Sequence, residues 1–360
     1  MRVLSVSSLK GGVGKTTVAL GLASAAFHQG LRTLVVDLDP QCDATTGLGA
    51  VGEFEYTVAS VLKNPKHNVV SKSIVASAWG KAGTGLVDVL LGSPRSIHHD
   101  TPHPTVRQTW KLEEALHHVE KDYDLVIIDT PPSINALTRT AWVASDSVLI
   151  VTEPGIFSVV AADRAMRAIE EIRQAITKRV RPLGILVNRY RPASKEQEFR
   201  VNELRDMFGD LILDGYLEEK AYLQQSQGAA RPIHTWPGEG AAVIADFFTD
   251  LLATAQSAFE VTSEELPVEQ PKEKRKFFRR HKRGKEKPQV IDIETALDTL
   301  GEELVTPTPV TESETQDWTE PAWDDNEIAA ESQPEISTNT GNWTFKAKDH
   351  NGNTGTLVVQ

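Results

Sequence analysis

The fold is decided near the start of the chain by the stretch VLSVSSLKGGVGKTT, residues 3–17. Residues 3–6 predict a short buried strand, and a helix is expected from Thr16 to about His28. The glycines between them let the backbone wrap closely around an anion, so that N–H groups and the helix N-terminus face the negative charge. This order of strand, glycine turn and helix predicts a phosphate-binding loop, for which an ordinary glycine turn is the alternative.

Two side chains of this loop have the chemistry that a nucleoside triphosphate requires. Lys15 would neutralise the β- and γ-phosphates, and the hydroxyl group of Thr16 would ligate Mg²⁺. The backbone N–H groups around them would cradle the same phosphates. The predicted nucleotide-binding residues of the loop are Gly11, Gly12, Val13, Gly14, Lys15, Thr16 and Thr17.

Carboxylates follow two further apolar runs. Residues 34–36 lead into Asp37 and Asp39, which alternation along an extended chain points the same way, toward the loop. Residues 125–128 end in Asp129, and an apolar strand would hold that carboxylate firmly near a metal ion. We expect Mg²⁺ to be held by Thr16, Asp39 and Asp129. A turn or helix-cap role for the first two aspartates is the alternative.

Apolar runs alternate with helical patterns through the first 259 residues. Strands are expected at 86–91, 147–151 and 183–187, and helices at 110–119, 160–176, 195–208 and 241–259. We predict an α/β domain with a doubly wound, mostly parallel sheet and helices on both faces, as in phosphate-loop NTPases. Ligands of such a domain bind beyond the carboxyl ends of the strands.

Charge is distributed unevenly along the chain, whose net charge is −12. Residues 1–259 sum to −3, residues 272–287 to +8 and residues 290–360 to −13. Blocks of like charge repel each other and offer little apolar surface to bury. We therefore expect one folded domain at 1–259 and a disordered, low-complexity tail at 260–360. The tail has a basic segment (residues 272–287) and an acidic segment (residues 290–335).

Composition excludes several classes of protein. A single cysteine, Cys42, rules out a disulfide framework and any metal centre that needs several thiolates from one chain. No apolar run reaches the roughly 18–20 residues of a membrane span, and no export signal is recognised, so a cytoplasmic location is expected. The histidines at 98, 99 and 103 lack accompanying carboxylates or thiolates, which favours a surface loop over a metal site.

The loop departs from the strict phosphate-loop pattern, because Leu9 replaces a glycine and Lys10 adds a second lysine. In this the chain resembles the deviant Walker-A ATPases of the ParA/MinD superfamily. The runs DLDPQ (37–41) and DTPP (129–132) resemble motifs of its ParA and Soj branch, and the resemblance spans about residues 1–255. It implies hydrolysis of ATP to ADP and phosphate, an ATP-bound homodimer, and a Lys10 that reaches the partner's phosphates.

Further residues take their expected roles from this resemblance. Lys10, Lys15 and Asp39 would be catalytic, with Asp39 supporting hydrolysis. Asn188 follows an apolar strand and would read the adenine edge, because a side-chain amide can both donate and accept. Pro232 lies in a segment that would border the base. The cofactors implied are ATP and Mg²⁺.

The resemblance also implies non-specific DNA binding and a ParB-like activating protein. Basic residues follow the strand that ends at Asn188 and fill the basic segment, and phosphates of DNA would attract either set. Each set is equally compatible with solvated surface. The candidate DNA-binding residues are Arg189, Arg191, Lys195, Arg200, Arg205, Arg275, Arg279 and Arg280.

Three functions stay open at this point. The first is a nucleoid-associated ATPase of chromosome or plasmid partition. The second is a MinD-like positioning ATPase whose basic segment contacts an anionic membrane. The third is a nucleotide-gated adaptor that acts through its tail, with hydrolysis incidental.

Overall fold

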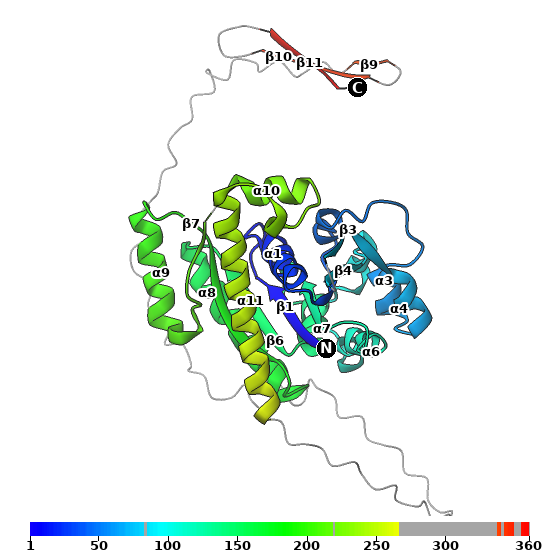
Figure 1. The fold of residues 1–360 in the computed structure, drawn as a ribbon, viewed down its shortest axis with the longest axis vertical. Coiled ribbons are helices and arrows are strands. Elements are labelled where there is room, and N and C mark those ends of the chain that lie inside the picture. The colour runs from blue at the N-terminus through cyan, green and yellow to red at the C-terminus, as the bar shows by residue number, and fades with distance from the viewer. Residues whose placement is uncertain (83–84, 219, 266–336, 340–341, 349–353, 360) are drawn as a thin grey trace, which may run out of the picture. The chain divides into compact units, whose positions relative to one another are not determined.

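The computed structural model describes residues 1–82, 85–218, 220–265, 337–339, 342–348 and 354–359 (Figure 1). The chain divides into two compact units, Met1–Lys274 and Arg275–Gln360, and each is described by itself. The strands of the first unit are β1 (Arg2–Ser7), β2 (Arg32–Asp37), β3 (Ile74–Ala82), β4 (Gly85–Leu90), β5 (Leu125–Asp129), β6 (Ser147–Thr152), β7 (Arg181–Tyr190) and β8 (Leu217–Glu218).

The same unit contains α-helices and short 3₁₀ helices between these strands. The α-helices are α1 (Lys15–His28), α2 (Asp43–Gly47), α3 (Val58–Lys63), α4 (His67–Ser73), α5 (Val106–Thr109), α6 (Lys111–His117), α7 (Ala136–Ala144), α8 (Ile156–Ala175), α9 (Lys195–Phe208), α10 (Ala221–Gly228) and α11 (Glu239–Glu265). The 3₁₀ helices are η1 (Pro94–His99), η2 (Gly209–Leu211) and η3 (Ile233–Thr235).

All eight strands belong to one sheet, in the order β3-β4-β2-β5-β1-β6-β7-β8. Every neighbouring pair is parallel except β3 with β4. Asp129 at the end of β5 lies opposite Val6 of β1 on one side and Asp37 of β2 on the other. The carboxyl ends of three central strands therefore meet at one edge. The predicted doubly wound, mostly parallel sheet is confirmed.

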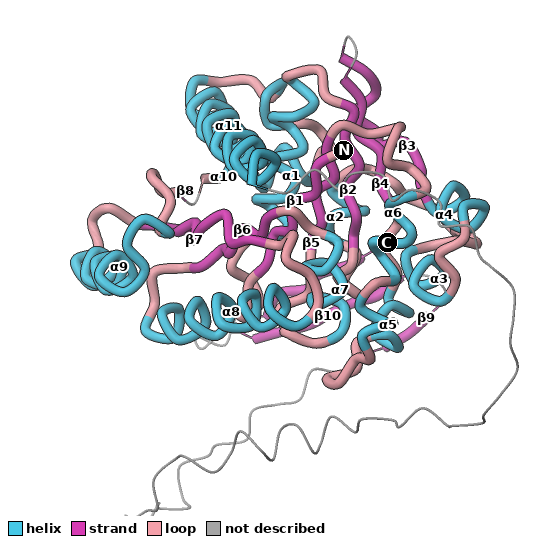
Figure 2. The backbone as a smooth tube through the Cα atoms, turned by 90° about the horizontal axis from the view of Figure 1, so that it is seen from below, coloured by secondary structure: helices cyan, strands magenta, loops and turns pink. Residues whose placement is uncertain are grey.

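Helices cover both faces of the sheet, and Figure 2 shows α1 and α11 on one side and α7 and α8 on the other. The side chains of β1 illustrate the two layers, because Leu4 and Val6 pack with α1 and α11 while Val3 packs into the opposite core. Strands that are buried on both faces need apolar side chains at every position. This explains why the sequence shows continuous apolar runs instead of alternation.

Helix α1 lies between the sheet and α11 and is buried along most of its length. Gly21 allows α11 to approach closely, since a Cβ atom at this position would come within 2.2 Å of the Phe248 ring. The helix that carries the end of the phosphate loop is thus fixed from both sides.

The structure also contains elements that sequence patterns did not predict. Strand β3 is an antiparallel edge strand in a segment that reads as irregular, and α7 and α10 are helices of nine and eight residues. The helix expected at 110–119 is present as α6, and a capping box between Thr105 and Gln108 starts a separate short helix, α5, immediately before it.

Helix α11 spans 27 residues and continues past the expected end of the folded domain at residue 259. Within the described part of the chain, neither this helix nor any other combines the length and apolar composition needed to cross a membrane.

The second unit contains β9 (Ser337–Asn339), β10 (Asn342–Lys348) and β11 (Thr354–Val359). Strand β10 pairs antiparallel with both others. The sequence interpretation placed only a low-complexity tail here, so this small sheet is a difference. The basic and acidic segments lie outside the described residues, and the division of the chain at residue 259 stays a prediction.

Candidate nucleotide-binding site

The phosphate loop joins β1 to α1 at the carboxyl edge of the sheet. Gly12 and Gly14 have φ angles of 77° and 92°, in the left-handed region that glycine enters without steric cost. Lys15 is only 7% exposed. Its positive charge favours the ionised forms of Asp39 and Asp129, which places its ammonium group near both carboxylates. The predicted phosphate-binding lysine therefore lies where the three strand ends converge.

Asp129 is the most buried acid of the site, with no exposed surface. Its Oδ2 atom accepts a hydrogen bond of 2.6 Å from the hydroxyl group of Thr16. Its Oδ1 atom has no hydrogen-bond partner among the described residues. Burial, and then the nearby charge of Asp37, raise the pKa of Asp129 to about 8. The carboxylate is therefore held by Thr16 in an environment where burial and the charge of Asp37 outweigh the positive charge of Lys15.

Asp37 and Asp39 occupy different surroundings although they were expected to act alike. Asp37 is fully buried, and its Oδ2 atom accepts bonds from the N–H group and the hydroxyl group of Thr45, at 2.8 and 2.7 Å. That threonine lies in the first turn of α2, so Asp37 fixes the start of this helix. Asp39 accepts a bond from the backbone N–H of Gln41, and burial raises its pKa. Asp37 thus fixes the start of α2, and the catalytic role of Asp39 stays a prediction.

These aspartates fit a bound magnesium ion. Burial raises the pKa of Asp37 to about 6, and the pKa values of Asp39 and Asp129 are also raised. The Oδ1 atoms of Asp37 and Asp129 are buried without a hydrogen-bond partner in the described residues. Carboxylate and hydroxyl oxygens are hard ligands that suit Mg²⁺. A divalent cation would supply the missing charge, and Thr16, Asp39 and Asp129 are the residues that would hold it.

Asn188 connects the end of β7 to the phosphate loop. Its side-chain amide donates a hydrogen bond of 2.6 Å to the backbone carbonyl of Val13, and its Oδ1 atom accepts one from the N–H group of Arg189. A Cβ atom on Gly14 would lie 2.2 Å from Nδ2 of Asn188. Gly14 is therefore required both for its backbone conformation and for this close approach. The residue expected to read adenine lies directly beside the loop.

Lys10 lies on the outer side of the loop, with its side chain 50% exposed. Its ammonium group is 3.0 Å from Oε2 of Glu153, which follows β6. The other oxygen of this carboxylate, Oε1, is 2.9 Å from the guanidinium group of Arg189. Sequence motifs did not point to Glu153. The signal that could have found it is an acidic residue at the end of a buried strand, the same signal that marks Asp129.

Pro232 precedes η3, in a loop that packs on α1. His234 anchors this loop: its backbone N–H donates to Oγ of Ser24, and its ring nitrogens lie 2.7 Å from that hydroxyl and 3.1 Å from the hydroxyl of Thr249. The Thr249 hydroxyl donates to the Ala245 carbonyl, so Nε2 of the histidine donates to Thr249 and Nδ1 accepts from Ser24. Burial lowers the pKa of His234 to about 4.

A buried hydroxyl network behind the loop was also missed. The Ser7 hydroxyl receives hydrogen bonds from Oγ1 of Thr130 and from Nε1 of Trp142, both at 2.9 Å. These contacts join the end of β1 to the residue after β5 and to α7. Small hydroxyl side chains within otherwise apolar runs are the signal for such a network.

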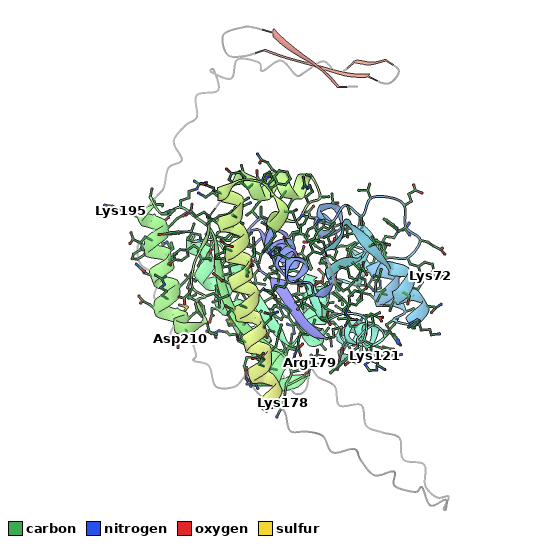
Figure 3. All side chains as sticks on the ribbon, in the orientation of Figure 1. Lys72, Lys121, Lys178, Arg179, Lys195 and Asp210 are labelled. Atoms are coloured by element: carbon green, nitrogen blue, oxygen red, sulfur yellow. The ribbon has the colours of Figure 1, made fainter. Side chains whose placement is uncertain are left out.

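The candidate DNA-binding residues on the described part of the chain are partly engaged by acids. Arg200 is 19% exposed and pairs with both Glu196 and Glu203. Helix α9 as a whole carries four acidic and three basic residues. Lys195 and Arg191 are exposed, and Figure 3 shows Lys195 at one end of α9 with Asp210 beyond the other. DNA binding by this helix stays a prediction, and Arg275, Arg279 and Arg280 lie outside the described residues.

Cys42 immediately precedes α2 and is partly buried. Burial and neighbouring aspartates raise the pKa of the Cys42 thiol to about 12, which keeps it protonated. His98 and His99 belong to η1. Among the described residues, no three or more histidine, cysteine, aspartate or glutamate side chains form a group that could hold a metal ion without other ligands.

The fold, the phosphate loop and the acidic strand ends together define a phosphate-loop NTPase. A family profile described as an AAA domain matches residues 1–181, half of the chain, and the chain belongs to this family.

Similar proteins of known name include partition ATPases. The chromosome partitioning protein ParA of Caulobacter vibrioides is 28% identical over 241 residues, covering 65% of this chain and 86% of that protein. The chromosome-partitioning ATPase Soj of Thermus thermophilus is 28% identical over 263 residues, covering 72% and 98%. The resemblance to ParA and Soj ATPases seen in the sequence motifs is confirmed.

Solved structures share the fold. Cobyrinic acid a,c-diamide synthase of Mycobacterium smegmatis, with a bound ATP analogue and magnesium, has a TM-score of 0.58 and 25% identity, covering 71% of this chain and 96% of that one. McdA of Cyanothece in complex with ATP has a TM-score of 0.61 at 19% identity, covering 71% and 96%. The second likeness shows the fold alone.

Proposed function

We propose that this protein is a magnesium-dependent ATPase that forms a homodimer when ATP is bound. The observation that carries the proposal is one edge of the sheet. There a buried lysine, a hydroxyl–carboxylate pair (Thr16 and Asp129) and a second carboxylate (Asp39) converge, while a second lysine stands exposed on the same loop. Similarity to ParA and Soj, and the ATP analogue with magnesium in a structural relative, support ATP and Mg²⁺ as the cofactors.

Each residue has a stated task in this mechanism. The loop amides and Lys15 bind the phosphates, and Lys15 neutralises charge that builds up during phosphoryl transfer. Mg²⁺, when bound, draws electron density from the phosphate oxygens. Asp129 keeps the Thr16 hydroxyl oriented, and Asp39 orients the attacking water. Asn188 borders the base and ties the loop to β7.

The cellular role that we propose is partition of a chromosome or a plasmid. The relatives named for chromosome partitioning cover most of the first unit, and their similarity supports this role. In this role, the ATP dimer would bind DNA non-specifically on the nucleoid, and a ParB-like protein would stimulate hydrolysis and release. An anionic membrane as the target of the basic segment is the competing outcome.

Two substitutions separate binding from turnover. Asp39→Ala should bind ATP and accumulate the dimer, because hydrolysis is lost while the phosphate contacts remain. Lys10→Ala should bind ATP but stay monomeric. Sedimentation velocity with and without Mg·ATP, together with phosphate release, measures both.

The matched control is Lys121→Ala. Lys121 is an exposed lysine that precedes β5, at the opposite edge of the sheet from the loop (Figure 3). Lys121→Ala should leave both ATP-dependent dimerisation and phosphate release unchanged. Normal ATP-dependent dimerisation of Lys10→Ala would contradict the proposed role of the second lysine.

DNA binding is tested by its dependence on salt. Each lost phosphate contact lowers the slope of log K against log salt by about 0.9. A chain truncated after Glu265, where α11 ends, should therefore show a flatter slope than the full chain if the basic segment carries the contact. An unchanged slope would place the contact within residues 1–265. Binding to anionic vesicles but not to DNA would contradict the partition role.

A further inference from the structure

Glu153 bridges two cations that come from distant parts of the chain. Its Oε2 atom lies 3.0 Å from Nζ of Lys10, and its Oε1 atom lies 2.9 Å from Nη1 of Arg189. The glutamate side chain is 22% exposed, while the lysine and arginine side chains are 50% and 42% exposed. One carboxylate thus ties the outer side of the phosphate loop to β7, the strand that contains Asn188 and Arg189.

These contacts are of the kind that exchange easily. Ion pairs open to solvent are weak because water screens the charges and the long side chains lose freedom when they pair. A polyphosphate carries more negative charge than one carboxylate and would compete well for the same ammonium group. The position of Lys10 is therefore set by a contact that a nucleotide can displace.

We propose that Glu153 is a positioning residue that holds Lys10 back from the dimer interface and thereby sets the ATP concentration at which the dimer forms. This inference rests on the proposed function, because it takes Lys10 as the lysine that reaches the partner's phosphates. When only a fraction of the molecules is in the binding-competent state, the apparent dissociation constant equals the intrinsic constant divided by that fraction. Holding Lys10 back lowers the competent fraction and so raises the apparent dissociation constant of the dimer.

Arg189 makes the exchange reversible. When Lys10 leaves Glu153, the arginine remains as a counter-ion, so the carboxylate is not left uncompensated beside the phosphates. Arg189 has a positive φ of 55°, and its backbone N–H donates to Oδ1 of Asn188. The guanidinium group that shares Glu153 with Lys10 is therefore anchored at the residue next to the loop contact of Asn188.

Removing the charge of Glu153 and removing the charge of Arg189 should have opposite effects on dimerisation. Glu153→Gln keeps the shape and removes the charge, so Lys10 is released and the apparent dimer dissociation constant should fall about two- to fivefold. Arg189→Gln removes one of the two cations that share Glu153 and leaves Lys10. Glu153 should then hold Lys10 more firmly, so the dimer dissociation constant should rise. Sedimentation velocity with a non-hydrolysable ATP analogue and Mg²⁺, without DNA, measures both constants.

Controls separate positioning from a general loss of structure. Glu153→Asp should retain part of the effect of the native charge. Asp163→Asn removes an acid from a comparable exposed pair with Arg167 on α8 and should change nothing. The thermal unfolding midpoint of the nucleotide-free variants should stay close to that of the native chain. In a Lys10→Ala background, Glu153→Gln should have no further effect on dimerisation.

The outcomes distinguish this inference from the proposed function. If Lys10→Ala abolishes the dimer but Glu153→Gln leaves its dissociation constant unchanged, the role of Glu153 is wrong and the proposed function stands. If both charge-removing variants shift the constant in the same direction, the opposing roles of Lys10 and Arg189 are wrong. If Lys10→Ala dimerises normally, the dimerisation mechanism itself is wrong.

Discussion

The inner half of the phosphate loop (residues 13–17) and its outer half (residues 10–12) differ in how firmly they are held. In the inner half, Lys15 is 7% exposed and the carbonyl oxygen of Val13 accepts a hydrogen bond from the side-chain amide of Asn188. The hydroxyl group of Thr16 donates to the fully buried carboxylate of Asp129. In the outer half, the side chain of Lys10 is 50% exposed and makes one exposed ion pair. Two lysines five positions apart therefore serve different purposes, one in a prebuilt site and one in a contact that can change partner.

The largest expected effect tests the inner half. Lys15→Ala removes the buried cation at the phosphates, so nucleotide affinity should fall by about 1.5–3 kcal/mol, the value of a charge-assisted contact. Titration calorimetry with ADP and Mg²⁺ measures it on the monomer. Lys10→Ala is the matched variant and should leave monomer affinity for ADP within a factor of about two. Equal losses of ADP affinity in Lys15→Ala and Lys10→Ala would show that the two halves of the loop do not differ in this way.

A somewhat smaller effect is expected from a methyl group at Gly14, in the inner half. Gly14→Ala combines a φ of 92° with a Cβ 2.2 Å from the amide of Asn188, and should lower the free energy of unfolding by about 1–3 kcal/mol. Gly12→Ala is the control, because φ is 77° but nothing lies within 4 Å of the added atom. Urea unfolding without nucleotide compares them. If Gly12→Ala is as destabilising as Gly14→Ala, the contact with Asn188 does not constrain the loop.

The smallest effect concerns the support behind the inner half. The pKa of His234 is about 4 in the folded chain, below its ordinary value of 6.5, so the unfolded chain binds more protons between these values. Stability should therefore fall as pH falls from 6.5 toward 4. His234→Asn removes this contribution, and its unfolding midpoint should fall less steeply over that range. If the unfolding midpoints of the native chain and of His234→Asn fall with equal slope as pH is lowered, the histidine does not titrate in this way.

The residues of the loop were predictable from the sequence, but the Glu153 contact that holds its outer half was not. Gly12, Gly14, Lys15 and Thr16 stand in a continuous motif, and Asp129 ends a continuous apolar run, so local pattern sufficed. Glu153 lies 143 positions from Lys10, and only the placement of β6 beside β1 brings them together. Patterns within one segment contain no information about such pairing.

The fold shows the same limit. Central parallel strands were recognised because burial on both faces demands continuous apolar residues. The edge strand β3 was not, because its sequence (IVASAWGKA) mixes small and polar residues and its pairing with β4 contains an irregular register. DNA binding by α9 is a prediction from its basic residues alone. Two of its four acidic residues, Glu196 and Glu203, pair with Arg200 and offset part of its charge.

The contact between Gly21 and Phe248 has a consequence for synthesis of the protein on the ribosome. The first helix is made at once, but the helix that covers it is encoded about 200 residues later. At 5–20 residues per second, roughly 10–40 s pass before that cover leaves the ribosome. During this interval the apolar surface of α1 that later packs on Phe248 and its neighbours is exposed. The emerging chain therefore has a defined period in which chaperones, or self-association, compete for its phosphate-loop helix.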